Sequence, residues 1–294
     1  MWSMTCTPSR HGTLLEGIRS AAGDKAEILY AKGSNIYYDA ETEKAATGIR
    51  PLERGDNRQL LDEALRIAAR ADVIVAALGE CAEMSGESVS RTNLEIPDAQ
   101  QDLLKALVKT GKPVVLLLFT GRPLVLNWEA TNVHSILNVW FGGSETGDAV
   151  ADVLFGKVAP SGKLTTTFPR SVGQLPLFYN HLNTGRPDPD NRIFNRYASN
   201  YLDESNEPLY PFGYGLSYTD FVYGELQISS ETLPKNGELT VSVTVTNKGN
   251  YDGYETVQLY LHDIYAEIAR PVKELKGFER VFLKSGESRD VKFV

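Results

Sequence analysis

The spacing of apolar residues changes along this chain and divides it into two parts of different fold class. As far as about residue 158, short apolar runs alternate with segments whose apolar residues recur every three to four positions. This alternation predicts an α/β fold, a mostly parallel sheet flanked by helices. From Phe221 onward the apolar residues recur at every second position, which predicts the short antiparallel strands of a β-sandwich.

In the first part, helical spacing of apolar residues predicts helices over residues 14–22, 57–71, 98–110 and 145–154. Short continuous apolar runs predict strands over residues 26–31, 72–78, 113–119 and 134–139. Residues 158–212 are rich in proline, glycine and aromatic residues, so we expect long packed loops rather than a flexible linker.

In the second part, strict alternation predicts strands over residues 238–246, 256–262, 273–283 and 288–293. About four or five strand candidates follow Phe221, whereas a sandwich of the immunoglobulin type needs about seven. We therefore expect an incomplete sandwich with an unpaired edge, and self-association into a homo-oligomer. The predicted domains are residues 1–218 and 219–294.

Composition excludes several classes of partner. The 294 residues carry a formal net charge of −8, which argues against binding to nucleic acid or to an anionic membrane. No apolar run approaches the ~20 residues that span a bilayer. The first residues lack a signal-peptide pattern, so the chain as given is expected to be cytoplasmic.

The two cysteines, Cys6 and Cys81, form neither a disulfide framework nor a metal motif. A packed free thiol is the favoured interpretation of Cys81.

A cluster of charged residues directly follows the predicted strand 72–78. Glu80, Glu83, Glu87 and Arg91 lie on the loop that leaves its carboxyl end. Ligands bind at this edge of open α/β sheets, and a carboxylate there can act as a general acid. Judged from the loop alone, a solvent-exposed Glu87 without a chemical role is the favoured interpretation. Glu80 is expected to stabilise the loop.

Motifs along nearly the whole chain resemble the C-terminal part of a family 3 glycoside hydrolase of the periplasmic β-glucosidase type. They occur in order at residues 86–94 (GESVSRTNL), 111–116 (GKPVVL), 120–124 (TGRPL), 140–147 (WFGGSETG), 160–164 (PSGKL), 209–218 (LYPFGYGLSY) and 270–278 (RPVKELKGF). The resemblance implies an α/β sandwich domain followed by part of a fibronectin type III-like domain. Full-length members are periplasmic or secreted.

The resemblance also implies a catalytic arrangement. Glu87 would be the general acid/base, with Arg91 and Ser88 as substrate-binding residues, acting on terminal β-linked glucosides or oligosaccharides without metal or cofactor. The nucleophile would be an aspartate of an N-terminal (β/α)8 barrel. Retaining glycosidases need the two carboxylates about 5 Å apart. Such a barrel needs ~250 residues and is not present in this chain, so we expect a barrel chain as partner and no glucosidase activity without it.

Other interpretations stay open. The chain is alternatively a carbohydrate-binding or assembly module, with sugars stacking on aromatic residues at Trp140, Phe141, Tyr179, Tyr197 and Tyr201, although packing of these rings is favoured. An esterase-like activity independent of a barrel is disfavoured, because the glycines around Ser144 do not have nucleophile-elbow spacing. Acidic residues at Asp188, Asp190, Asp203 and Glu204 fit a solvated loop better than a metal site.

Overall fold

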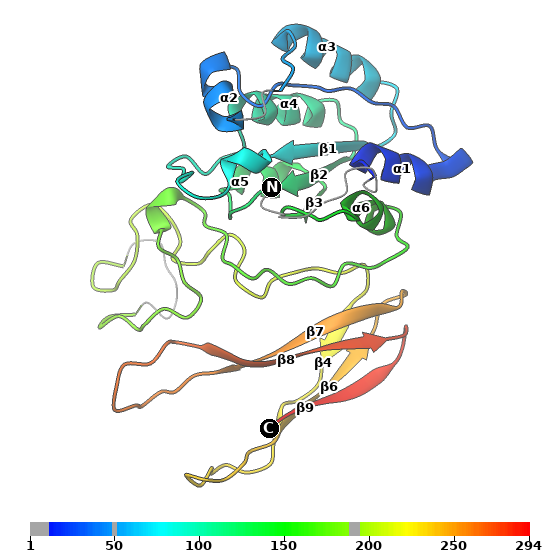
Figure 1. The fold of residues 1–294 in the computed structure, drawn as a ribbon. Coiled ribbons are helices and arrows are strands. Elements are labelled where there is room, and N and C mark those ends of the chain that lie inside the picture. Colours follow the sequence, from blue (N-terminus) through cyan, green and yellow to red (C-terminus); the bar gives the residue numbers. More distant parts are fainter. Residues whose placement is uncertain (1–11, 49–51, 188–194) are drawn as a thin grey trace. The chain divides into compact units, whose positions relative to one another are not determined.

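The computed structural model describes residues 12–48, 52–187 and 195–294. The chain divides into two compact units (Figure 1). Unit 1 comprises Met1–Ala151 and Phe168–Leu175, and unit 2 comprises Asp152–Thr167 and Pro176–Val294. Each unit is thus built from two stretches of chain. The predicted domain boundary at residue 218 stays a prediction.

Unit 1 is organised around a three-stranded parallel sheet in the order β1-β2-β3. Its strands are β1 (Ile74–Gly79), β2 (Val114–Phe119) and β3 (Ser135–Asn138). The central strand is apolar along its length, and Val114, Leu116, Leu117 and Leu118 are fully buried. A strand covered on both faces requires such a continuous run. The α/β class predicted from the sequence is confirmed.

The α-helices of the described residues are α1 (Leu14–Ala22), α2 (Ala40–Thr47), α3 (Asn57–Ala68), α4 (Asp98–Val108), α5 (Asn127–Asn132) and α6 (Thr146–Leu154). Figure 1 shows helices flanking the sheet. Side chains cap several of them. Thr13 and Glu16 form a reciprocal capping box at the start of α1, and Asp39 and Asp56 accept backbone N–H bonds at α2 and α3. Each cap satisfies amides that have no partner within the helix.

The structure differs from several local expectations, among them those for residues 26–31 and for helix α2. Residues 26–31 were predicted to be a strand, but no strand is formed there and the large side chain of Tyr30 is 59% exposed. The run therefore lacks the burial that would draw it into the sheet. Helix α2 was not predicted, because its sequence (AETEKAAT) contains alanine but no apolar stripe. The Asp39 cap and alanine propensity account for it instead.

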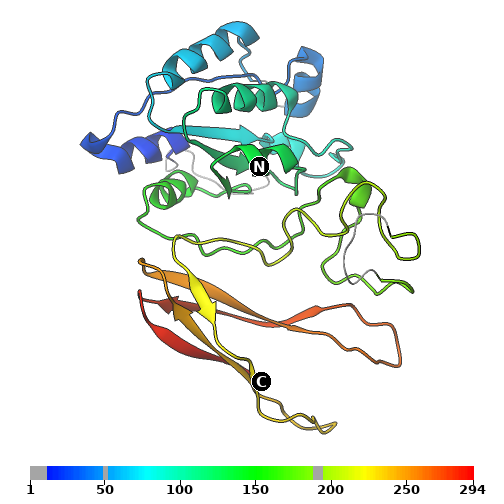
Figure 2. The same ribbon diagram turned by 180° about the vertical axis from the view of Figure 1, so that it is seen from behind.

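Unit 2 contains two antiparallel sheets, whose strands Figure 2 shows from behind. The strands are β4 (Phe221–Tyr223), β5 (Gln227–Ile228), β6 (Val241–Asn247), β7 (Gly253–Leu261), β8 (Glu274–Leu283) and β9 (Ser288–Phe293). In one sheet, β6 pairs with β9 along one edge and with β4 and β5 along the other; β7 and β8 form the second sheet. Their core is Val245, Val257, Val281, Leu283 and Val291. The predicted β-sandwich is confirmed, with six strands after residue 220 rather than four or five.

The described long loops of unit 2 are packed only in part, because Tyr197 and Tyr201 are 75% and 38% exposed although packing of their rings was favoured. Tyr179 stacks on Phe212 with ring centroids 4.1 Å apart and meets the ring of Tyr260 edge-on at 6.1 Å. The Gly213 amide donates to the Leu164 carbonyl at 2.7 Å. These contacts tie the loops to β7.

The described part of the chain contains no helix with the length and apolar character of a membrane span.

Candidate functional site

The site begins at the carboxyl edge of the parallel sheet, where β1 and β2 end side by side. The register pairs Gly79 with Phe119, so the next residues, Glu80 and Thr120, are neighbours. The Glu80 amide donates to the Phe119 carbonyl at 2.7 Å. The Thr120 hydroxyl and the Gly121 amide donate to Oε2 of Glu80 at 2.8 and 3.2 Å. Strand register therefore fixes a carboxylate at this edge.

Two arginines neutralise this carboxylate. Arg91 Nη1 lies 2.7 Å and Arg122 Nε 3.1 Å from Oε1 of Glu80. The Glu80 side chain is fully buried, whereas those of Arg91 and Arg122 are 14% and 20% exposed. A buried carboxylate is tolerated when it is paired and hydrogen-bonded. Glu80 meets both conditions and is a structural anchor, as expected from the sequence.

Arg122 also contacts the backbone of the loop that carries Glu87. Its Nη2 donates to the carbonyls of Met84 and of Val89, the latter at 3.1 Å. These two carbonyls lie on either side of residues 85–88. Sequence reasoning missed this role, although the signal was present: Arg122 belongs to the motif at residues 120–124, directly after a buried strand.

The loop turns tightly on either side of Glu87. Gly86 has a φ of 146° and Ser88 a φ of 59°, a left-handed conformation that is uncommon for a residue other than glycine. The loop also presses on the neighbouring segment: a Cβ on Gly121 would lie 2.1 Å from Oγ of Ser85. Glycine at position 121 is therefore required for this close approach.

Glu87 itself is exposed at the tip of this loop, as is Ser88. Within the described part of the chain, no hydrogen bond or ion pair is found for the Glu87 carboxylate. The structure brings Arg91 to Glu80 rather than pairing it with Glu87. Arg91 Nη2 additionally donates to the Glu95 carbonyl at 3.0 Å. Arg91 is thus engaged by Glu80 and the Glu95 carbonyl, and the exposed carboxylate of Glu87 is left available.

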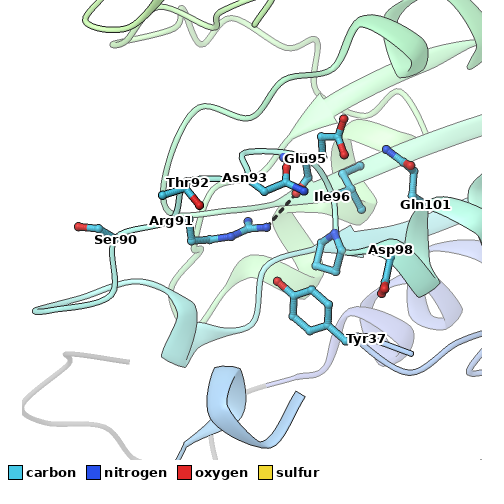
Figure 3. Close-up of a pocket in the computed structure, with 10 residues that line it drawn as sticks. Tyr37, Ser90, Arg91, Thr92, Asn93, Glu95, Ile96, Asp98 and Gln101 are labelled. Carbon is cyan, nitrogen blue, oxygen red and sulfur yellow. Dashed lines mark hydrogen bonds between the residues drawn. The ribbon is translucent and has the colours of Figure 1, made fainter. Parts of the chain in front are cut away.

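A cavity of about 390 Å³ lies beside the second half of the motif (Figure 3). Residues 90–93 and 95–98 line it together with Tyr37 and Gln101. Burial raises the pKa of Tyr37, an effect that the charge of Arg91 partly opposes. The lining offers hydroxyl, amide, carboxylate and guanidinium groups, all of which can hydrogen-bond a polar ligand. Glu87 is not among the lining residues.

The other residues singled out in the sequence are an aromatic residue, the cysteines and the acidic residues considered for a metal site. Trp140 packs against Phe168 with ring centroids 5.8 Å apart and has a φ of 56°. Burial raises the pKa of the half-buried Cys81 thiol, as expected for an unreactive packed cysteine. In the described ranges no cluster of His, Cys, Asp or Glu could hold a metal ion. Cys6, Asp188 and Asp190 lie outside those ranges.

Comparison with known families follows the two-part organisation. Residues 1–218 match the glycosyl hydrolase family 3 C-terminal domain. The chain belongs to this family. Residues 255–294 match the fibronectin type III-like domain. The resemblance drawn from the motifs is confirmed.

Relatives of known name cover the chain from end to end. It is 49% identical to the periplasmic β-glucosidase of Salmonella typhimurium over 99% of the chain, which is 38% of that protein. It is 40% identical to a β-xylosidase of Formosa agariphila over 97% of the chain and 36% of that protein. The chain therefore spans less than two fifths of the length of these two relatives.

Solved structures agree with this assignment. The β-glucosidase of Listeria innocua in complex with gluconolactone superposes with a TM-score of 0.79 at 40% identity, covering 98% of this chain and 37% of that one. A β-glucosidase of Erythrobacter marinus gives a TM-score of 0.81 at 38% identity, covering 96% and 38%. The fold of the chain is therefore similar to that of these two solved β-glucosidases.

Proposed function

We propose that the chain is the acid/base-bearing part of a family 3 β-glucosidase and that Glu87 is its general acid/base. In the first step, a carboxylate nucleophile attacks the anomeric carbon while Glu87 gives its proton to the departing glycosidic oxygen. In the second, ionised Glu87 takes a proton from the water that hydrolyses the glycosyl ester. The substrates are terminal β-glucosides, and no metal or cofactor is needed.

The observation that carries this proposal is the contrast between the two carboxylates of the loop. Glu80 is buried and neutralised by Arg91 and Arg122. Glu87 is exposed on a loop whose ends are held at the carboxyl edge of the sheet. A general acid has to reach a glycosidic oxygen while its backbone stays in place, and this arrangement supports both requirements.

Ser88 and Arg91 are proposed to bind substrate. Arg91 carries five N–H donors, of which one bonds Glu80 and another the Glu95 carbonyl. Its side chain also lines the cavity beside the motif, where its charge and remaining donors suit sugar hydroxyls. Ser88 adjoins Glu87 and is exposed, so its hydroxyl suits the same role.

The nucleophile is proposed to come from a (β/α)8 barrel, since the chain spans only 38% of the Salmonella relative. On this proposal the chain without a barrel has no glucosidase turnover. The complete protein is proposed to be periplasmic, like that relative, with its domain boundary near residue 218.

Hydrolysis of an aryl β-glucoside tests the proposal in two settings. The first is the chain alone. The second is a chimera in which the chain replaces the matching segment of the Salmonella β-glucosidase. We expect turnover only in the chimera and a loss of about 10²–10⁴-fold in the Glu87→Gln chimera. Turnover by the chain alone, or full activity of the Glu87→Gln chimera, would contradict the assignment.

A β-xylosidase is the second candidate, because the Formosa agariphila relative with that name is 40% identical over nearly the whole chain. Both activities would use Glu87 in the same way. Comparing kcat/KM for aryl β-xyloside and aryl β-glucoside in the same chimera separates them, with the glucoside expected to be preferred.

A further inference from the structure

We infer that Arg122, oriented by Glu80, is a positioning residue for Glu87. The inference rests on the proposed function of Glu87 and extends it to two residues with no chemical step of their own. Its basis is the double contact of one guanidinium group with the carbonyls of Met84 and Val89.

The contact holds both ends of residues 85–88. A guanidinium group is planar and rigid, so two carbonyls bound to it keep a fixed separation. The loop has few other restraints. Met84 and Ser85 donate backbone hydrogen bonds to Cys81 and Ala82 at 3.0 and 3.3 Å, and no backbone–backbone bond of residues 86–90 is found within the described ranges. Without Arg122 the acid-bearing segment would gain conformational freedom.

Glu80 fixes the orientation of Arg122 in turn. Oε1 and Oε2 of Glu80 lie 3.1 and 3.3 Å from Nε of Arg122, leaving the outer end of the guanidinium group for the loop. Glu80 is itself held by the pairing of β1 with β2 through its amide and through Thr120. The position of Glu87 therefore traces back to the register of the sheet.

The expected effect on the reaction is selective. A general acid matters when the leaving oxygen needs a proton, and its contribution depends on being within hydrogen-bond reach. Aryl glucosides with a strongly acidic phenol, such as 2,4-dinitrophenol, depart without that proton. A displaced Glu87 should therefore slow cleavage of phenyl β-glucoside much more than that of 2,4-dinitrophenyl β-glucoside.

Arg54 provides a matched control in the same unit. It pairs with the buried Glu43 at 2.8 Å and donates to two backbone carbonyls, those of Tyr37 and Tyr38, at 3.2 and 2.9 Å. It thus makes the same kinds of bond as Arg122, but to a different segment of backbone. Loss of Arg54 tests whether removal of any such arginine produces the selective effect.

The experiment measures kcat/KM for both substrates in the chimera carrying Arg122→Gln, Arg54→Gln or Glu87→Gln. We expect Arg122→Gln to lower the phenyl glucoside rate at least about tenfold more than the dinitrophenyl rate, and Arg54→Gln to change both rates equally. If Glu87→Gln slows the phenyl glucoside selectively but Arg122→Gln changes both rates equally, the positioning role is overturned. If Glu87→Gln is itself unselective, the proposed function fails instead.

A second variant keeps the inference testable if Arg122→Gln does not fold. Arg122→Lys preserves the charge opposite Glu80, but its single nitrogen cannot replace both Nε beside Glu80 and Nη2 at the two carbonyls. In the chain alone, amide hydrogen exchange should accelerate over residues 84–90 in this variant and stay unchanged over residues 37–54. Unchanged exchange over residues 84–90 would overturn the inference.

Discussion

Gln100 and Gly79 close a reciprocal pair of hydrogen bonds at the end of β1. The Gly79 amide donates to Oε1 of Gln100, and Nε2 of Gln100 donates to the Gly79 carbonyl, both at 2.8 Å. The side chain, from α4, satisfies the backbone groups that face away from β2. The same glycine has a φ of 132°, and a Cβ there would lie 1.9 Å from the Phe119 carbonyl oxygen. The strand end that leads into Glu80 is thus held from both sides.

Replacing Gln100 by alanine would leave the amide and carbonyl of Gly79 without these partners in a buried position. A buried unpaired group costs about 1–3 kcal/mol, so we expect Gln100→Ala to lower the free energy of unfolding by that order. Gln101→Ala is the control: Gln101 is only half-buried and bonds the Lys105 side chain. Urea unfolding measures both, and equal losses would show that the Gly79 contact is unimportant.

The close approach of the acid loop to Gly121 is testable by adding one methyl group. In Gly121→Ala the new Cβ would meet Oγ of Ser85 at 2.1 Å and the Phe141 ring at 2.8 Å. Overpacking of this kind costs about 1–3 kcal/mol. Gly143→Ala, with nothing within 4 Å, should change the unfolding free energy little. Partial rescue of Gly121→Ala by Ser85→Gly would locate the clash, and absence of any cost would refute it.

The buried carboxyl group of Glu129 makes the free energy of unfolding depend on pH. Burial is the main cause that raises the pKa of this carboxyl, and one of its oxygens has no partner. As pH rises above the ordinary pKa of glutamate, the unfolded chain loses the proton first, so stability falls until pH passes the raised folded pKa. Glu129→Gln should therefore gain stability over the wild type between about pH 4 and pH 7. Urea unfolding at both pH values tests this, with exposed Glu63→Gln as the control, for which a similar gain would contradict the mechanism.

Tyr223 anchors a buried carboxylate in unit 2. Its hydroxyl donates to Oε1 of Glu255 at 2.8 Å, and Lys163 lies 3.3 Å from Oε2. Removing the hydroxyl in Tyr223→Phe should cost about 1–3 kcal/mol, because a hydrogen bond to a charged group is lost. Tyr251→Phe, at a 64% exposed position, should cost little.

The raised pKa of Tyr223 predicts that the free energy of unfolding falls at alkaline pH. Burial, and then the bond to Glu255, raise the pKa of Tyr223. Above about pH 10 the unfolded chain ionises while the folded chain keeps its proton, so wild-type stability falls with pH. The difference between the wild type and Tyr223→Phe should therefore narrow in alkali. A constant difference from pH 8 to pH 11 in unfolding measurements would contradict the shift.

The predictable part of the fold is the part with a regular apolar pattern, which is periodic in a helix such as α1 and continuous in a buried strand such as β2. The amphipathic α1 was located from its apolar spacing to the residue, and the uninterrupted run of β2 within one residue. Helix α5 was not predicted, because its six residues are too few to show a periodic pattern. In the site, the loop acids were recognisable as a cluster. Arg122 lies in a recognisable motif at residues 120–124, but its partners could not be predicted, because they are the backbone carbonyls of Met84 and Val89.

The network around Glu80 also bears on protein engineering. Glu80 and Arg91 belong to the loop after β1, whereas Arg122 belongs to the segment after β2, so two separate stretches of chain hold one short loop. Transplanting residues 84–91 alone into a related scaffold would deliver Glu87 and Arg91 without Glu80 or Arg122. The smallest portable piece of this site is therefore discontinuous, and a designer exchanging substrate loops has to carry both strand ends along with the loop.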